Sequence, residues 1–196
     1  GNETRSQNAV ILEETVLYTR RSGGTISKIA AMKNAVGNFI DQVAANATGD
    51  PATNEDDVTH RISIVKFAGS STDSVGNDTY NDWFYTYNYS QVVKDLTEVS
   101  GSNVQVLKNT VNSLEASGAT QVNYGLNHAQ RVLAGEGQLT GAREDAKKVV
   151  VVFTDGNPTS GSTWEGSVAA SAVNLANDLK DGGVTVYTIG MFDGAN

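Results

Sequence analysis

The sequence predicts an α/β fold of the doubly wound type, with a mainly parallel central sheet and helices on both faces. Two observations predict this fold. Short runs of β-branched residues alternate with longer segments of helical periodicity, as in chains built from strand–helix–strand units. The strongest of these runs, Val149–Thr154, is apolar at almost every position, as in a strand that is buried on both faces.

Composition excludes several classes of protein. The 196 residues suit one domain, and 39% hydrophobic with 18% charged residues suits a chain that folds around a core. A formal net charge of −8 argues against nucleic acid as the main partner, because phosphates attract clustered cations. We find no apolar stretch near the roughly 18 residues of a membrane span. The absence of cysteine excludes disulfide scaffolds, thiolate metal sites and cysteine nucleophiles.

The first half of the chain predicts two strands and a helix. Residues 1–13 read as a polar lead-in, and the domain is expected to cover residues 14–196. A short β-prone run, Glu14–Thr19, ends at a turn that contains glycine, and apolar residues then recur at steps of three and four over residues 29–43. After a polar loop, Arg61–Ala68 has the composition of a buried strand.

The second half continues the alternation. We expect helices over residues 104–114, 126–133 and 168–179, a turn over residues 117–120 and a last strand at Val184–Ile189. Val149–Thr154 is then the central strand, flanked by Glu14–Thr19 and Val184–Ile189.

Residues 69–90 predict an excursion from the sheet that ends in an edge strand near Tyr87–Val93. Six of the fourteen aromatic residues fall within residues 80–89. Trp83, Tyr85, Tyr87 and Tyr89 alternate, so in a strand they share one face. That face either covers the core, or presents Trp83, Tyr85 and Tyr87 as ligand-binding candidates for a sugar or a peptide partner.

No enzyme signature is found in the sequence. It lacks the G-x-x-x-x-G-K-[ST] loop of nucleotide hydrolases, the G-x-S-x-G elbow of serine hydrolases and the G-x-G-x-x-G turn of dinucleotide enzymes. His60 and His128 have no second ligand at metal spacing, and His128 reads as a helix-surface or packing residue. We therefore expect no catalytic residues. Function in such sheets gathers in the loops after the strands, here 20–25, 117–121 and 155–159.

Four stretches in order resemble the von Willebrand factor A domain: KIAAMKNAVGNFID, SLEASGATQVNYGLNHAQRVL, VVVVFTDGNPTSG and DGGVTVYTIGMFDGAN. They are most similar to the A domains of Gram-positive pilus-tip and cell-wall adhesins. The resemblance covers about residues 14–196 and implies a doubly wound fold. Because such domains usually continue through a further helix, strand and helix, it also implies a domain truncated or split at its C-terminal side.

The resemblance implies a metal-ion-dependent adhesion site that is degenerate here. In the family, a D-x-S-x-S loop, a middle-loop threonine and an aspartate after the central strand hold the ion. Ser22, Thr120 and Asp155 match three of these ligands. Arg20 stands in place of the first aspartate, and Gly24 in place of the second serine.

Arginine at position 20 disfavours Mg²⁺, which prefers carboxylate, hydroxyl and water oxygens. At about 4 Å and an effective dielectric constant near 20, each unit-charge interaction is worth roughly 4 kcal/mol. We expect Arg20 to pair with Asp155 in place of the ion. The alternative is an outward-pointing Arg20 that leaves a weak site of Ser22, Thr120 and Asp155.

The expected function is that of an adhesin-type binding module of a bacterial surface or pilus protein, located outside the cell. Its partners would be a host or extracellular-matrix protein or glycan, together with neighbouring domains of a larger surface protein. The alternative is a structural pilus or cell-wall subunit whose degenerate site binds nothing.

Overall fold

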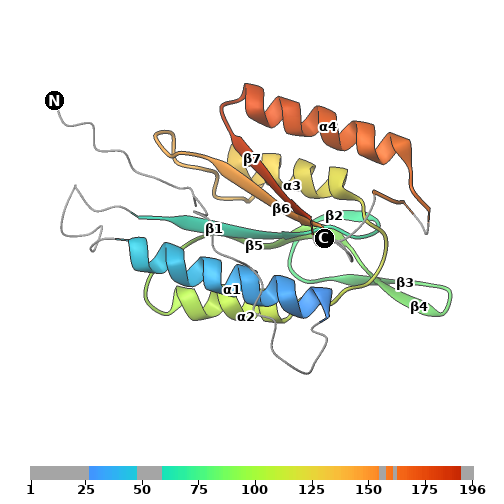
Figure 1. Cartoon of the computed structure of the whole chain (residues 1–196), viewed down its shortest axis with the longest axis horizontal. Coiled ribbons are helices and arrows are strands. Elements are labelled where there is room, and N and C mark those ends of the chain that lie inside the picture. Colours follow the sequence, from blue (N-terminus) through green and yellow to red (C-terminus); the bar gives the residue numbers. More distant parts are fainter. Residues whose placement is uncertain (1–26, 48–58, 155–157, 161–162, 191–196) are drawn as a thin grey trace, which may run out of the picture.

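The computed structural model describes residues 27–47, 59–154, 158–160 and 163–190 (Figure 1). These residues form four helices and seven strands, in the order α1, β1 to β5, α2, α3, β6, α4 and β7. None of the helices in these ranges is long and apolar enough to cross a membrane.

The helices lie where the apolar periodicity predicts them. α1 begins after Ser27, whose side-chain oxygen accepts a hydrogen bond of 3.3 Å from the backbone N–H of Ala30. The helices are α1 (Lys28–Asn46), α2 (Asn103–Asn112), α3 (Val122–Ala134) and α4 (Gly166–Asp181). The sequence-based prediction of these four helices is confirmed.

Two strands form the predicted parallel pair. β6 (Val149–Thr154) pairs in register with β7 (Thr185–Gly190) over the full length of both strands. Every residue of β6 is buried or half-buried, in agreement with its apolar composition. The α/β class and the place of Val149–Thr154 beside the last strand are therefore confirmed.

The other strands form two small sheets. β5 (Ser90–Glu98) lies between β1 (Arg61–Lys66) and β2 (Ser71–Val75). β5 runs antiparallel to β1 and parallel to β2. β3 (Thr79–Asp82) and β4 (Tyr85–Asn88) form an antiparallel hairpin that projects from the body of the molecule (Figure 1).

The pairings refine one expectation and correct another. The described strands form three small sheets in place of one continuous central sheet, with two parallel and two antiparallel pairings. β1 and β5 are antiparallel because no helix lies between them: the chain returns directly from the excursion at residues 69–90, so β5 runs back beside β1. The strand expected at an edge near Tyr87–Val93 begins instead at Ser90 and has neighbours on both sides.

Helices cover both faces of the strands, as predicted (Figure 1). On one face, Ile40 of α1 and Leu107 of α2, both fully buried, pack with Ile64 of β1 and Val93 of β5. A second cluster joins α3 and α4 to β6 and β7; its buried members are Leu126, Val152, Leu179 and Val184. The two helix layers thus bury separate apolar clusters.

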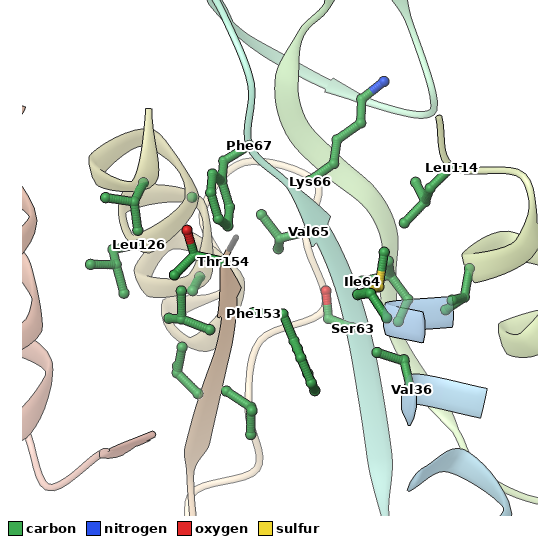
Figure 2. Close-up of a pocket in the computed structure, with 18 of the residues that line it drawn as sticks. Val36, Ser63, Ile64, Val65, Lys66, Phe67, Leu114, Leu126, Phe153 and Thr154 are labelled. Carbon is green, nitrogen blue, oxygen red and sulfur yellow. The ribbon is translucent and has the colours of Figure 1, made fainter. Parts of the chain in front are cut away.

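A groove of about 800 Å³ lies between β1 and β6 and is lined by residues of α1 and α3 as well as both strands. Figure 2 shows Val65 of β1 and Phe153 of β6 in the space between the two strands. Among the described strands β1 pairs with β5 and β6 pairs with β7, so each turns its other edge towards the groove. Glu14–Thr19, predicted to flank β6, lies outside the described residues, and its place stays a prediction.

We expect Val16→Asp to lower the free energy of unfolding by about 2–4 kcal/mol, because a carboxylate on the strand predicted at Glu14–Thr19, beside β6, would lose its hydration. Val10→Asp makes the same chemical change in the lead-in predicted at residues 1–13 and should have little effect. Urea unfolding of both variants checks the prediction. Equal, small effects would contradict the placement of Glu14–Thr19 within the sheet.

Candidate functional site

Thr120 lies where the end of β1 meets the segment that follows β6. Its backbone N–H donates to Oγ1 of Thr159 over 3.0 Å, and the N–H of Thr159 donates to the Thr120 carbonyl over 3.1 Å. The next residue, Gln121, donates its N–H to the carbonyl of Ala68 over 3.2 Å. Two of the three loops singled out from the sequence are therefore in direct contact.

Gly118 allows this close approach. Its φ of 101° lies in the region that side chains disfavour. A Cβ at this position would also lie 3.4 Å from both the Cβ of Ala68 and the backbone nitrogen of Gly69. Glycine is thus favoured here for its backbone conformation, which brings the Thr120 loop against the end of β1.

The other predicted site residues lie outside the described residues. These are Ser22 and Asp155, with Arg20 and Gly24 at the two altered positions. The structure shows the chain on both sides of Asp155: Thr154 ends β6, and Thr159 is bonded to Thr120. The pairing of Arg20 with Asp155 stays a prediction. Within the described part of the chain, no three histidine or acidic side chains are grouped as metal ligands.

The β3–β4 hairpin is fastened to the loop that carries Thr120. Ser117 Oγ donates to the Thr86 carbonyl over 2.9 Å, and Asn88 Nδ2 donates to the Glu115 carbonyl over 2.6 Å. The sequence predicts the excursion and the loop separately, but no motif predicts this contact. The hairpin therefore extends the surface around Thr120.

Buried polar groups hold the base of the excursion. Lys66 is only 8% exposed, and its ammonium group donates to Asn77 Oδ1 over 2.6 Å and to the Asp78 carbonyl over 2.8 Å. Burial lowers the pKa of Lys66, and the nearby Asp78 carboxylate partly opposes that shift. Gln91, which is fully buried, donates to Asp78 Oδ2 over 2.9 Å and accepts from the Asp78 backbone N–H over 2.7 Å. Hydrogen bonds from Gln91 and Ser74 lower the pKa of Asp78.

Tyrosine rings form a row along the hairpin. Tyr80 contacts Tyr89 and Tyr87, with ring centroids 4.6 and 5.8 Å apart, and Tyr87 contacts Tyr85 at 6.3 Å. Gly69 makes room for this row, because a Cβ there would collide with the Tyr80 hydroxyl. Tyr85, Tyr87 and Tyr89 are thus linked, as expected of a common face, through a tyrosine that the prediction did not include.

Trp83 stands apart from this row. It lies in the turn between β3 and β4, and its ring contact is with Phe84, at 6.4 Å between centroids. Of the three ligand-binding candidates, Trp83 is 91% exposed and Tyr85 67% exposed, whereas Tyr87 is half-buried. Phe84, which the sequence analysis did not select, is 89% exposed. The alternation rule fails here because a turn interrupts the strand.

His128 is a packing residue, one of the two roles expected for it. It is 1% exposed, and its Nε2 lies 2.9 Å from Ser71 Oγ and 3.0 Å from the Ser90 carbonyl. A carbonyl oxygen only accepts and an arginine only donates, so Nε2 carries the proton and Nδ1 faces Arg131 at 3.4 Å. The ring in this state takes no proton from Ser71, so the pair is not a nucleophile with its general base.

Helices on both faces of the strands, with the Thr120 loop bonded to the segments that follow β1 and β6, are consistent with a doubly wound α/β domain, the class in which ligands bind at the carboxyl ends of the strands. The profile of the von Willebrand factor type A domain family matches residues 21–196. The chain therefore belongs to this family, whose members are generally non-catalytic protein-binding modules and often bind a metal ion. A search of curated proteins finds no significant match.

We expect Lys66→Met to lower the free energy of unfolding by about 1–3 kcal/mol, since Asn77 Oδ1 and the Asp78 carbonyl each lose a buried donor. Lys108→Met is the matched control, because Lys108 forms a partly exposed ion pair with Asp41. Urea unfolding compares the two variants. A decrease in the free energy of unfolding in Lys108→Met as large as that in Lys66→Met would contradict the anchoring role of the buried ammonium group.

Burial lowers the pKa of His128, so the unfolded chain binds a proton more readily than the folded chain does. Stability therefore falls as the pH drops below the unfolded value of about 6.5, by up to about 1.4 kcal/mol per pH unit. We expect His128→Gln to remove this dependence and His60→Gln to retain it. Unfolding curves between pH 7.5 and pH 5 are the measurement, and an unchanged slope in His128→Gln would contradict the assignment.

Proposed function

We propose that the chain is an adhesin-type binding module of a bacterial surface or pilus protein. In this proposal it acts outside the cell and binds a host or extracellular-matrix protein or glycan. The binding face is the surface formed by the Thr120 loop, the segment from Pro158 to Ser160 and the β3–β4 hairpin. We call this surface the strand-end face.

The observation that carries the proposal is the joining of these elements by hydrogen bonds. Thr120 is bonded to Thr159, and the hairpin is bonded to Ser117 in the same loop. A face assembled from three separate segments loses little conformational entropy on binding, because its backbone is already held in place. Membership of a family of protein-binding modules supports the same conclusion.

We propose further that Arg20 takes the place of a metal ion at this face. The donor set supports this: two hydroxyls and one carboxylate remain in Ser22, Thr120 and Asp155, and a guanidinium replaces the second carboxylate. An arginine–carboxylate pair fixes Asp155 by charge-assisted hydrogen bonds. Ligand binding at this face is then independent of divalent ions.

One observation favours a second candidate, a structural subunit of a pilus or cell wall. The substitutions at positions 20 and 24 remove two of the family's five metal ligands, which suits a domain that packs within a larger assembly and binds nothing at this face.

Binding assays separate the two candidates. The purified chain is tested on immobilised type I collagen, fibronectin and fibrinogen and on a glycan array, with and without EDTA. The adhesin proposal expects saturable binding to at least one probe, unaffected by EDTA and several-fold weaker in Thr120→Val. Thr97→Val, at the far end of β5, is the control. If the chain binds none of these probes, the structural subunit is favoured.

The altered metal site has a separate test. The double change Arg20→Asp with Gly24→Ser rebuilds the family's ligand set, so we expect calorimetry to detect Mg²⁺ binding in this variant and none in the parent chain. Adding Asp155→Asn to the double variant should abolish the binding. Equal, tight binding by the parent would show that Arg20 points away from the site.

A further inference from the structure

The tip of the β3–β4 hairpin exposes three consecutive aromatic side chains. Trp83 is 91%, Phe84 89% and Tyr85 67% exposed. Isolated exposed apolar residues are common on protein surfaces, but a contiguous group marks a site of interaction. The tip also projects from the body of the molecule, so a partner reaches these rings freely (Figure 1).

The tip is held in a defined shape. All four residue pairs of the hairpin are in register, and Thr86 Oγ1 donates to Asn81 Oδ1 over 2.9 Å. Trp83 has a φ of 55°, which makes it the one residue other than glycine with positive φ in the described ranges. A bulky side chain in this conformation is strained, and strain of this kind gathers at functional sites.

The ring geometry favours a protein over a sugar. The planes of Trp83 and Phe84 meet at 57°, so the two rings do not form one flat platform for the faces of a sugar chain. Together they form a wedge, a shape that fits an apolar pocket. Tryptophan and tyrosine are also the residues that dominate binding energy at protein interfaces.

Charge narrows the class of partner. Residues 69–90 contain Asp73, Asp78 and Asp82 and no lysine or arginine. Asp73 pairs with Arg131 over 2.5 Å and Asp78 lies by Lys66, whereas Asp82, next to Trp83, is exposed and has no ion-pair partner among the described residues. Nucleic acids and anionic membranes are therefore repelled, and a basic surface is attracted.

The area of the tip is smaller than the area that a stable protein–protein interface buries on each partner. An aromatic side chain buries about 150–250 Å², so three bury roughly 450–750 Å². A stable interface needs about 800 Å² from each partner. The loop around Ser117 is bonded to the hairpin and is the adjoining surface that would have to supply the remainder.

We propose that Trp83 and Phe84 insert into an apolar pocket, rimmed by basic groups, of a protein that binds the strand-end face. This proposal rests on the proposed function for the shared face, and it adds the partner's chemistry and the residues that recognise it. Tyr85, the third exposed ring of the tip, contacts Tyr87 of the tyrosine row.

A phage-displayed library of random linear and cyclised peptides, selected on the immobilised chain, is the probe. We expect the selected peptides to combine apolar with basic residues. Their affinity should fall about tenfold or more in the double variant Trp83→Ser with Phe84→Ser. Val173→Ser removes a 59% exposed apolar residue from α4 and is the control. Both rings are exposed, so the double variant should unfold at the same urea concentration as the parent.

Either of two outcomes of the selection would overturn the proposal: peptides that bind the double variant as tightly as the parent, or the enrichment of no peptide. Binding of array glycans through Trp83, in the absence of any selected peptide that needs Trp83, would also overturn the proposal, because the partner would then be a sugar. A different measurement would contradict the proposed function: the chain would bind none of the matrix proteins and none of the glycans. The two failures are therefore distinguishable.

Discussion

The hydrogen bonds around Thr120 hold together parts of the chain that belong to separate sheets. Gln121 is bonded to Ala68 after β1, and Thr120 is bonded to Thr159 after β6. Among the described strands β1 and β6 share no ladder, so this loop links the two halves at the edge where the strands end. Gly118 favours the link, because a side chain at its φ of 101° would be strained. The candidate site depends on this contact, since it brings the loop between α2 and α3 against the segments that follow β1 and β6.

The hairpin depends on a second constraint, the burial of Lys66 and Gln91 beneath it. A buried ammonium group is unfavourable unless its hydrogen bonds are satisfied. Asn77 and Asp78 satisfy them, so this stretch between β2 and β3 is held against β1. The exposed tip is consequently the end of a hairpin whose base is held in place. Such a hairpin with exposed rings is suited to binding, because ordering it on contact costs little entropy.

Much of the fold could be predicted because it depends on local periodicity. The helices at Lys28–Asn46 and Gly166–Asp181 and the strand Val149–Thr154 each have a pattern that only one element fits. The position of β5 could not be predicted in this way, since its place between β1 and β2 depends on the return path of the excursion. The separation of Trp83 from the tyrosine row was missed for a similar reason: a turn at Trp83 breaks the alternation of the strand.

The loops of the candidate site could be predicted from the sequence, but the contacts that join them could not. Thr120 was identified from its resemblance to a family motif, and the structure adds its bond to Thr159 and the hairpin beside it. Neither contact has a signal in the sequence, because both join residues more than thirty positions apart. Lys66 likewise lies in a run that the sequence predicts as a buried strand, and its role as an anchor follows from the burial of its ammonium group.

Amide hydrogen exchange measured by NMR would show directly whether the strand-end face is formed before any ligand binds. The amides of Thr120, Gln121 and Thr159 each donate a hydrogen bond in this contact. We predict that all three amides exchange much more slowly than amides in an unstructured peptide. Exchange at the rate of an unstructured peptide would show that the loops are not joined, and would contradict a preformed binding face.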